Sequence, residues 1–208
     1  MLKNNPGLTQ VVTAGLSAVG PNSTHSHAFG GNGTGNFFDP SQARNATQSA
    51  FSNGADFYKI VAEVNGPSLE SQVALVNNVT ALGKQTMTHA ATVEAYIQAI
   101  QSGANGIQHL PQDGVLNSSM IARMLAQGQT VTPTISVFQY EYTEPAIDAA
   151  FSVPFLNSSA AIQQLDWVMH NARNFYEAGI TILAGTDAVG VVQLSPKAPA
   201  INLSLIHI

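Results

Sequence analysis

The stretch that decides the fold is Gly54-Ala55-Asp56-Phe57-Tyr58-Lys59-Ile60, in which a glycine closes a helical segment and a short β-prone run follows. A glycine suits the position after a helix because it adopts the left-handed conformation there at little cost. The same arrangement returns at four later glycines: Gly83, Gly103, Gly128 and Gly179. Five such units in a row predict parallel βα architecture.

Apolar residues at three- and four-residue spacings predict a helix before each of these glycines. The expected helices span residues 41–53, 69–82, 92–102, 117–127 and 159–178. The expected strands lie near residues 9–16 and at 57–61, 86–89, 106–109, 131–134 and 181–184. Six strands, where a closed βα barrel needs eight, predict an α/β fold that forms part of a TIM barrel.

Composition narrows the class of protein. The chain has 208 residues, of which 45% are hydrophobic and 9% charged, which is typical of a globular chain but short of the roughly 250 residues of a complete barrel. Only 7 Lys and Arg residues and a net charge of -5 argue against a nucleic-acid partner. The absence of cysteine excludes disulfides and thiolate metal sites.

Sequence features that indicate a cellular compartment are sparse. No apolar run reaches the roughly 18 to 20 residues of a membrane span, and residues 1–20 lack the pattern of a signal peptide, so no membrane partner is expected. Seven Asn-x-Ser/Thr sequons favour secretion, although several arise by chance in a chain this rich in Asn, Ser and Thr, so a cytoplasmic location stays open. The sequons begin at Asn22, Asn32, Asn45, Asn78, Asn117, Asn157 and Asn202. The sequence does not predict an oligomeric state.

Four of the expected strands end in a side chain that can bind a metal, namely Lys59, His89, His109 and Asp187. Side chains at the C-terminal ends of parallel barrel strands converge on one mouth, so the four are expected to act together. The pattern predicts a metallohydrolase barrel. The stretch 137–157, which contains Pro145, Pro154 and several aromatics, predicts a long loop over that mouth, with Tyr140 as a possible substrate contact.

In these motifs the chain resembles the amidohydrolase superfamily, specifically its branch of metal-dependent amidases with a carboxylated lysine, which includes imidazolonepropionase-like and ochratoxin-hydrolysing enzymes. The resemblance covers about residues 11–189. Its most specific pieces are residues 54–60, 88–91, 103–109 and 178–188, whose order and spacing match the family's strands four, five, six and eight.

The resemblance implies a role for each strand-end residue. Lys59 would be carboxylated and bridge two metal ions, zinc or another divalent metal, because a free lysine with a pKa near 10.4 is protonated and cannot be a ligand. His89 and His109 would ligate the second metal. Asp187 would bind the first metal and act as general base, while hydroxide bridging the metals attacks a small-molecule amide.

Simpler roles for the same residues stay open. Either histidine can be a hydrogen-bonded structural residue, and Asp187 can cap a following helix. Lys59 can extend from the barrel edge to solvent or pair with Asp56 or Glu63. A single zinc held by the two histidines and Asp187, without the lysine, is a further alternative.

The pair His25 and His27 is not equivalent to the His-x-His of this family's first strand, because only one helix separates it from Lys59. Three βα units, well over 60 residues, would have to intervene. The pair corresponds instead to the loop after strand three. There it can contact substrate or only order a glycine-rich loop.

Parts of the family pattern are missing from this sequence. It holds roughly strands 3 to 8 and lacks strands 1 and 2 and the small β-sandwich domain, so residues 1–202 are expected to be an incomplete barrel. Residues 203–208, Leu-Ser-Leu-Ile-His-Ile, match the translation of a transposon-end sequencing adapter and are expected to be an artefact. We expect the isolated fragment to be unstable and inactive because it exposes two sheet edges. The rival hypothesis is a non-catalytic βα-barrel binding or scaffold module that has lost its first metal site.

Overall fold

The computed structural model describes residues 6–7, 11–28, 35–135, 158–185 and 187. Between residues 43 and 132 helices and strands alternate, and five strands form one parallel sheet in chain order, β1-β2-β3-β4-β5. The predicted α/β class and parallel architecture are therefore confirmed. The chain divides into two compact units, residues 1–89 with 97–106 and residues 90–96 with 107–208.

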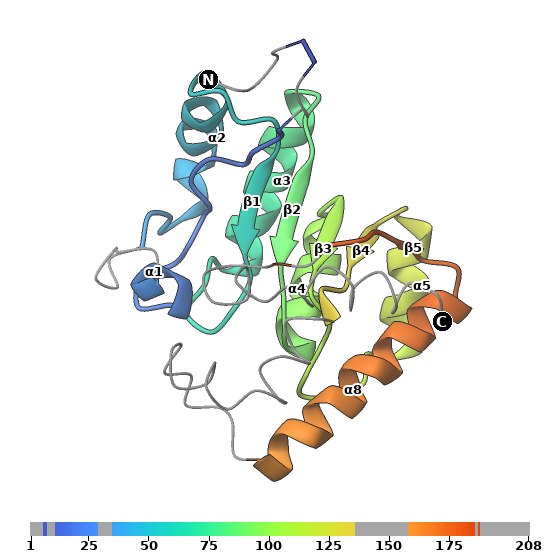
Figure 1. The fold of residues 1–208 in the computed structure, drawn as a ribbon. Coiled ribbons are helices and arrows are strands. Elements are labelled where there is room, and N and C mark those ends of the chain that lie inside the picture. The colour runs from blue at the N-terminus through green and yellow to red at the C-terminus, as the bar shows by residue number, and fades with distance from the viewer. Residues whose placement is uncertain (1–5, 8–10, 29–34, 136–157, 186, 188–208) are drawn as a thin grey trace. The chain divides into compact units, whose positions relative to one another are not determined.

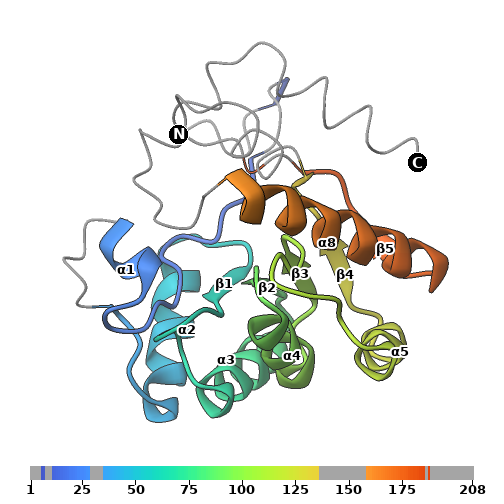
Figure 2. The same cartoon turned by 90° about the horizontal axis from the view of Figure 1, so that it is seen from below.

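The first unit contains strands β1 and β2 with the helices that cover them. Its elements are α1 (Thr24–Ala28), a 3-10 turn (Pro40–Gln42), α2 (Ala43–Ser52), β1 (Tyr58–Val61), α3 (Leu69–Ala81), β2 (Thr86–His89) and the second half of α4 (Val93–Ser102). The two strands run side by side in the same direction (Figure 1). Helices α2 and α3 lie on the same side of them (Figure 2), where Tyr58, Ile60, Leu75 and Val79 form the centre of a buried core.

The second unit contains β3 (Gly106–Gln108, apart from its first residue), α5 (Ser118–Ala126), β4 (Thr130–Thr132), α8 (Ser158–Glu177) and β5 (Thr181–Ile182). Its core includes Tyr96 and Phe175, whose ring centroids lie 5.6 Å apart. The buried side chain of Asn171 on α8 donates to the backbone carbonyls of Pro111 and Gly114 and accepts from the N–H of Leu116. This helix therefore holds the loop that follows β3.

The five glycines that follow the predicted helices all have left-handed backbones. Their φ values are +91°, +65°, +81°, +64° and +79° at Gly54, Gly83, Gly103, Gly128 and Gly179. At four of them the next residue donates its N–H to the carbonyl five positions earlier, which is the hydrogen bond of a Schellman motif. The four bonds are Ala55 to Ala50, Lys84 to Val79, Gln129 to Met124 and Ile180 to Phe175, at 3.0 to 3.1 Å. Each helix thus ends where the sequence predicts, and a strand begins two to four residues after the glycine.

The strand predicted near residues 9–16 is wrong for the part that the structure describes, because residues 11–16 contain no strand. Gly15 has a φ of +67°, which interrupts an extended run, and Leu16 is 81% exposed, so no burial favours pairing there. Backbone pairing occurs further along the chain. The N–H of Ala18 donates to the carbonyl of Lys59, and the carbonyl of Ala18 accepts from Val61.

Four of the predicted strands also change their boundaries, and β1 begins at Tyr58, one residue later than predicted. Strand β3 ends at Gln108, β4 spans Thr130–Thr132 instead of 131–134, and β5 spans only Thr181–Ile182. The physical reason at β3 and β4 is a left-handed backbone, with φ of +75° at His109 and +47° at Thr134, which removes these residues from extended geometry. Among the described residues, no helix is both long enough and apolar enough to cross a lipid bilayer.

Replacement of Gly83 tests whether the left-handed glycine itself stabilises the fold. A Cβ at this position would meet nothing within 4 Å, so Gly83→Ala introduces no clash and only the backbone conformation opposes it. We expect a loss of about 1 to 2 kcal/mol in the free energy of unfolding. Gly83→Asn, the matched control, should lose less because asparagine tolerates this conformation. Urea denaturation measures both, and an alanine variant as stable as the wild type would contradict the account.

Candidate functional site

Lys59 and His89 lie on one face of the paired strands β1 and β2. Successive side chains of a strand alternate between faces, and Tyr58 and Ile60 are buried in the core on the helix side. The parallel register places Lys59 beside Met87 and Val61 beside His89. The two predicted ligands of the first unit therefore share the face opposite that core, with His89 as the last residue of its strand.

Glu63, two residues after the end of β1, binds His25 with both carboxylate oxygens. Oε1 accepts from the backbone N–H of His25 at 3.0 Å, and Oε2 lies 2.9 Å from Nδ1 of its ring. Burial raises the pKa of Glu63, but hydrogen bonds from the ring and backbone of His25, its charge, and a bond to the Ser23 side chain outweigh burial, so the pKa is lowered overall. The carboxylate is therefore ionised at neutral pH.

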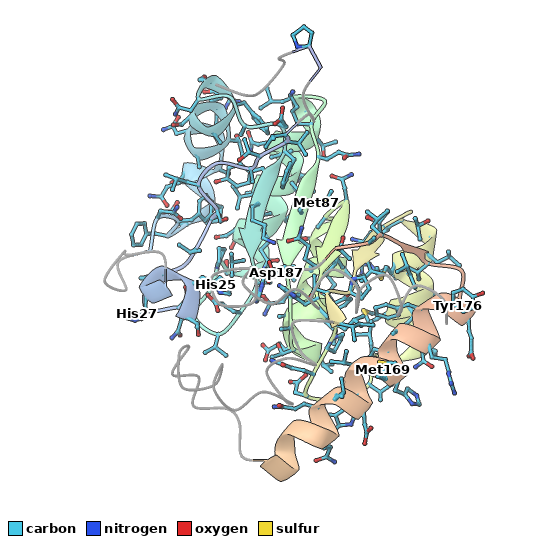
Figure 3. All side chains as sticks on the ribbon, in the orientation of Figure 1. His25, His27, Met87, Met169, Tyr176 and Asp187 are labelled. Atoms are coloured by element: carbon cyan, nitrogen blue, oxygen red, sulfur yellow. The ribbon has the colours of Figure 1, made fainter. Side chains whose placement is uncertain are left out.

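Of the two histidines on α1, His25 is the one that faces a predicted ligand. The centroid of its ring lies 4.3 Å from that of His89, with the planes at 65° to each other. His27 is exposed, and the two side chains point to different sides of the short helix (Figure 3). His25 is thus both hydrogen-bonded to Glu63 and in contact with a strand-end residue.

In the second unit, His109 is held on several sides. Its backbone N–H donates to the carbonyl of Thr132 at 2.9 Å, and its carbonyl accepts from the hydroxyl of Tyr96 at 3.2 Å. Burial raises the pKa of Tyr96 well above its ordinary value, so this hydroxyl stays a donor. The ring nitrogen Nδ1 lies 2.7 Å from Oγ1 of Thr134. These contacts fix the position and the rotation of the imidazole.

Asp187 lies beside the other ring nitrogen of His109. Its Oδ2 is 3.8 Å from Nε2, and the Asp187 side chain is 48% exposed, against 8% for His109. His109, Thr134 and Asp187 follow β3, β4 and β5, and all three have left-handed backbones, with φ of +75°, +47° and +48°. Such a conformation costs about 1 to 2 kcal/mol in a residue with a Cβ and is concentrated at functional sites.

The separation of His109 from Asp187 fits a shared cation. At 3.8 Å the two atoms are too far apart for a hydrogen bond. Zinc binds nitrogen at about 2.0 to 2.1 Å and carboxylate oxygen at about 2.0 to 2.2 Å in tetrahedral geometry, which places two ligand atoms about 3.4 Å apart, so the two side chains would have to approach by roughly 0.4 Å to share one ion. In the part of the chain that the structure describes, no three His, Cys, Asp or Glu side chains form a metal-binding group.

The structure brings the predicted residues into two separate sets. Lys59, His89 and His25 belong to the first unit, and His109 and Asp187 to the second. Tyr140 and most of the predicted mouth loop 137–157 lie outside the described residues, as do residues 203–208. The division into 1–202 and an artefactual tail, and the ligand roles themselves, stay predictions.

Sequence reasoning did not assign a site role to Glu63 or Thr134. From the sequence, Glu63 is expected only as an ion-pair partner for Lys59, and Thr134 only as the end of a strand. The sequence contains a signal for both residues, since each is a polar residue two positions after the end of a strand whose neighbours in the sheet carry predicted ligands. The sequence does not show that Glu63 contacts His25, 38 positions away, or that Thr134 contacts His109, 25 positions away.

No protein-family model and no curated protein sequence matches the chain. Solved structures do match. A Xaa-Pro dipeptidase with methionine bound in its active site has a TM-score of 0.68 at 21% identity over 93% of this chain. An amidohydrolase scores 0.67 at 20% identity over 84% of the chain, and the ochratoxinase of A. niger scores 0.66 at 16% identity over 86%.

The chain has the fold of the amidohydrolase superfamily. The resemblance seen in the sequence motifs is confirmed at this level, and so is the expectation of a partial TIM barrel. The chain covers 54%, 44% and 46% of the three solved chains, so it spans about half the length of the amidohydrolase-fold proteins that it matches.

The lowered pKa of Glu63 gives the stability of this amidohydrolase fold a pH dependence. Because the folded pKa lies below the ordinary value of 4.5, the ionised form stabilises the folded state above that pH, and the contribution is lost as pH falls through the lowered value. We expect Glu63→Gln to lower the free energy of unfolding by about 1 to 3 kcal/mol at pH 7 and by progressively less below pH 4.5. Glu70→Gln, at an exposed carboxylate, is the control, and an equal effect of both variants at pH 7 would contradict the expectation.

Proposed function

We propose that the protein to which this chain belongs is a metal-dependent hydrolase of amide C–N bonds, and that this chain supplies roughly strands 3 to 8 of its barrel. Two findings support the proposal. The chain has the fold of structures whose names include a Xaa-Pro dipeptidase and an ochratoxinase. Four of its strands are followed by, or end in, polar side chains of the types that bind divalent metals or assist ligands: His89, His109, Thr134 and Asp187.

The observation that carries the proposal is the arrangement around His109. Thr134 engages Nδ1 at 2.7 Å, while Nε2 faces a carboxylate oxygen of Asp187 at 3.8 Å, so two groups that can bind divalent metals lie side by side. Metal-binding histidines commonly have the second ring nitrogen held in this way, because the hydrogen bond fixes the tautomer and the direction of the ring. Three left-handed residues lie in this arrangement, and strained backbone of this kind is concentrated at functional sites, which supports a role in metal binding.

The ligands we propose are Lys59, His89, His109 and Asp187, holding zinc or another divalent ion, with two ions in the whole protein. Lys59 acts as a ligand only after carboxylation, since its free amine is protonated at neutral pH. When bound, such ions make water nucleophilic at neutral pH and polarise a carbonyl group. Asp187, half exposed beside buried His109, is the group we assign to accept a proton and deliver it to the leaving amine.

The proposed substrate is a small amide of the dipeptide or N-acyl amino acid class, with an apolar group beside the scissile bond. The low content of charged residues, 9% of the chain, supports an apolar environment around the scissile bond. The names of the structural neighbours point to the same class of compound. A panel of N-acetyl amino acids and Xaa-Pro dipeptides is therefore the first set of probes.

Metal counting in the product of the full-length gene tests the proposal. We expect about two divalent ions per chain in the wild type, and about one in Lys59→Ala because the bridging carbamate is lost, with hydrolysis of the probe panel abolished in the variant. Lys84→Ala, at an exposed lysine on the loop after α3, should retain both metal and activity. Elemental analysis by mass spectrometry and a ninhydrin assay for released amine measure the two quantities.

The same experiment separates the alternatives. One metal in both the wild type and Lys59→Ala, with activity retained, would show a single zinc held without the lysine. A wild-type protein that binds no metal and hydrolyses no probe would refute the proposal and favour a non-catalytic binding or scaffold module.

A further inference from the structure

Tyr96 on α4 is a fully buried tyrosine that the proposed function does not use. It is 0% exposed, and its ring packs on Phe175 of α8 with the ring centroids 5.6 Å apart. A buried tyrosine hydroxyl usually has a hydrogen-bond partner, whereas phenylalanine would fill the same space without one. The partner here is the backbone carbonyl of His109, 3.2 Å away. The hydroxyl is the donor in this bond, because a carbonyl oxygen only accepts.

His109 is a residue at which such a bond has consequences, because its backbone leaves the strand. Its φ of +75° lies outside extended geometry, while its N–H still donates to the carbonyl of Thr132 on β4. The rotamers that a side chain can adopt depend on the φ and ψ of its own residue. The hydroxyl of Tyr96 therefore holds the peptide group whose rotation helps to direct the imidazole of a proposed metal ligand.

The first turn of α4 is joined to the chain after β3 by two further hydrogen bonds. The N–H of Val93 donates to Oδ1 of Asp113 at 2.7 Å, and the N–H of Gln112 donates to the carbonyl of Ala91 at 3.0 Å. Residues 90–96 accordingly belong to the second compact unit, although the rest of α4 belongs to the first. The tyrosine therefore lies on an element that is fixed to the same segment as its partner.

Helix α8 holds this segment from a different element. Asn171, which is 0% exposed, donates to the carbonyls of Pro111 and Gly114 and accepts from the N–H of Leu116. Phe175, about one turn later on the same helix, is the residue that packs on the tyrosine ring. Two helices of the second unit therefore fix the chain between the end of β3 and the start of α5.

We propose that Tyr96 is a positioning residue for metal binding, which acts through the backbone of His109 and keeps its imidazole beside Asp187. The inference rests on the proposed function. Nε2 of His109 and Oδ2 of Asp187 are 3.8 Å apart in this arrangement. Without the hydroxyl, the peptide group after His109 loses one of the bonds that fix its rotation, and the imidazole is directed towards Asp187 less of the time. The site thereby gains a helix residue in addition to the residues at its strand ends.

Tyr96→Phe is the decisive variant, because it removes only the hydroxyl and keeps the ring on Phe175. The matched control is Thr47→Val, which removes a buried hydroxyl that donates to the carbonyl of Ala43 at 2.8 Å in the first unit. Each variant loses a buried bond from a hydroxyl to a carbonyl, so both should lower the urea midpoint of unfolding by a similar amount. Only Tyr96→Phe should weaken metal binding.

Zinc alone is the probe, added to the metal-free product of the full-length gene in competition with a chelator of known affinity. His109→Gln identifies the binding step that belongs to this site. We expect the zinc dissociation constant of that step to rise about 10-fold in Tyr96→Phe and to keep the wild-type value in Thr47→Val. Asp113→Ala, at an exposed residue, loosens the first turn of α4 without altering the core and should raise the constant about 3-fold.

A Tyr96→Phe protein with the wild-type zinc affinity would overturn the inference and leave the proposed function intact. An equal loss of affinity in Thr47→Val would also overturn it, because the effect would then follow from reduced stability. If Tyr96→Phe does not fold, Asp113→Ala decides the matter, and an unchanged dissociation constant in that variant contradicts the inference. A wild type that binds no zinc refutes the proposed function and the inference with it.

Discussion

The rest of the structure depends on one backbone constraint, the left-handed glycine that ends each of the helices α2, α3, α4, α5 and α8 and precedes the next strand. At four of these glycines the following N–H bonds the carbonyl five positions back, which closes the helix and turns the chain. The glycines themselves accept positive φ with little strain, and four of the five have open space where a Cβ would stand. Repetition of this turn produces strands that all run in the same direction, and it therefore sets where their C-terminal ends fall.

After the C-terminal ends of three strands, the left-handed conformation occurs in residues other than glycine. His109, Thr134 and Asp187 are left-handed although each has a Cβ, which costs about 1 to 2 kcal/mol at a β-branched residue such as Thr134 and less at an aspartate. The left-handed conformation ends the strand early, and hydrogen bonds then determine the direction of the histidine side chain. Thr134 fixes His109 in this way, and Glu63 fixes His25 beside His89 in the other unit. In both units a polar residue that is not itself a proposed ligand holds a histidine by Nδ1.

Local signals in the sequence were sufficient for the five helices that precede the glycines, for β2 and for the parallel class of the sheet, but not for the short helix α1. Glycine spacing and helical periodicity are properties of short segments, and helix α3 ends within one residue of its prediction at Leu82 for that reason. The strand near residues 9–16 was mispredicted because β propensity there is outweighed by Gly15 and by exposure of Val12 and Leu16. The roles of Glu63 and Thr134 could not be predicted, since they arise from contacts between residues far apart in the sequence. Lys59, His89, His109 and Asp187 were identified by residue type and position, and their roles as ligands remain proposals.

Anomalous diffraction at the zinc edge, from crystals of the full-length gene product grown with zinc, tests the central claim most directly. The account predicts two peaks about 3.5 to 4 Å apart, one or both within bonding distance of Nε2 of His109 and a carboxylate oxygen of Asp187, with His89 and a carboxylated Lys59 among the ligands. Zinc bound only to other residues, or no anomalous peak beside His109 and Asp187 in crystals that contain zinc, would contradict it.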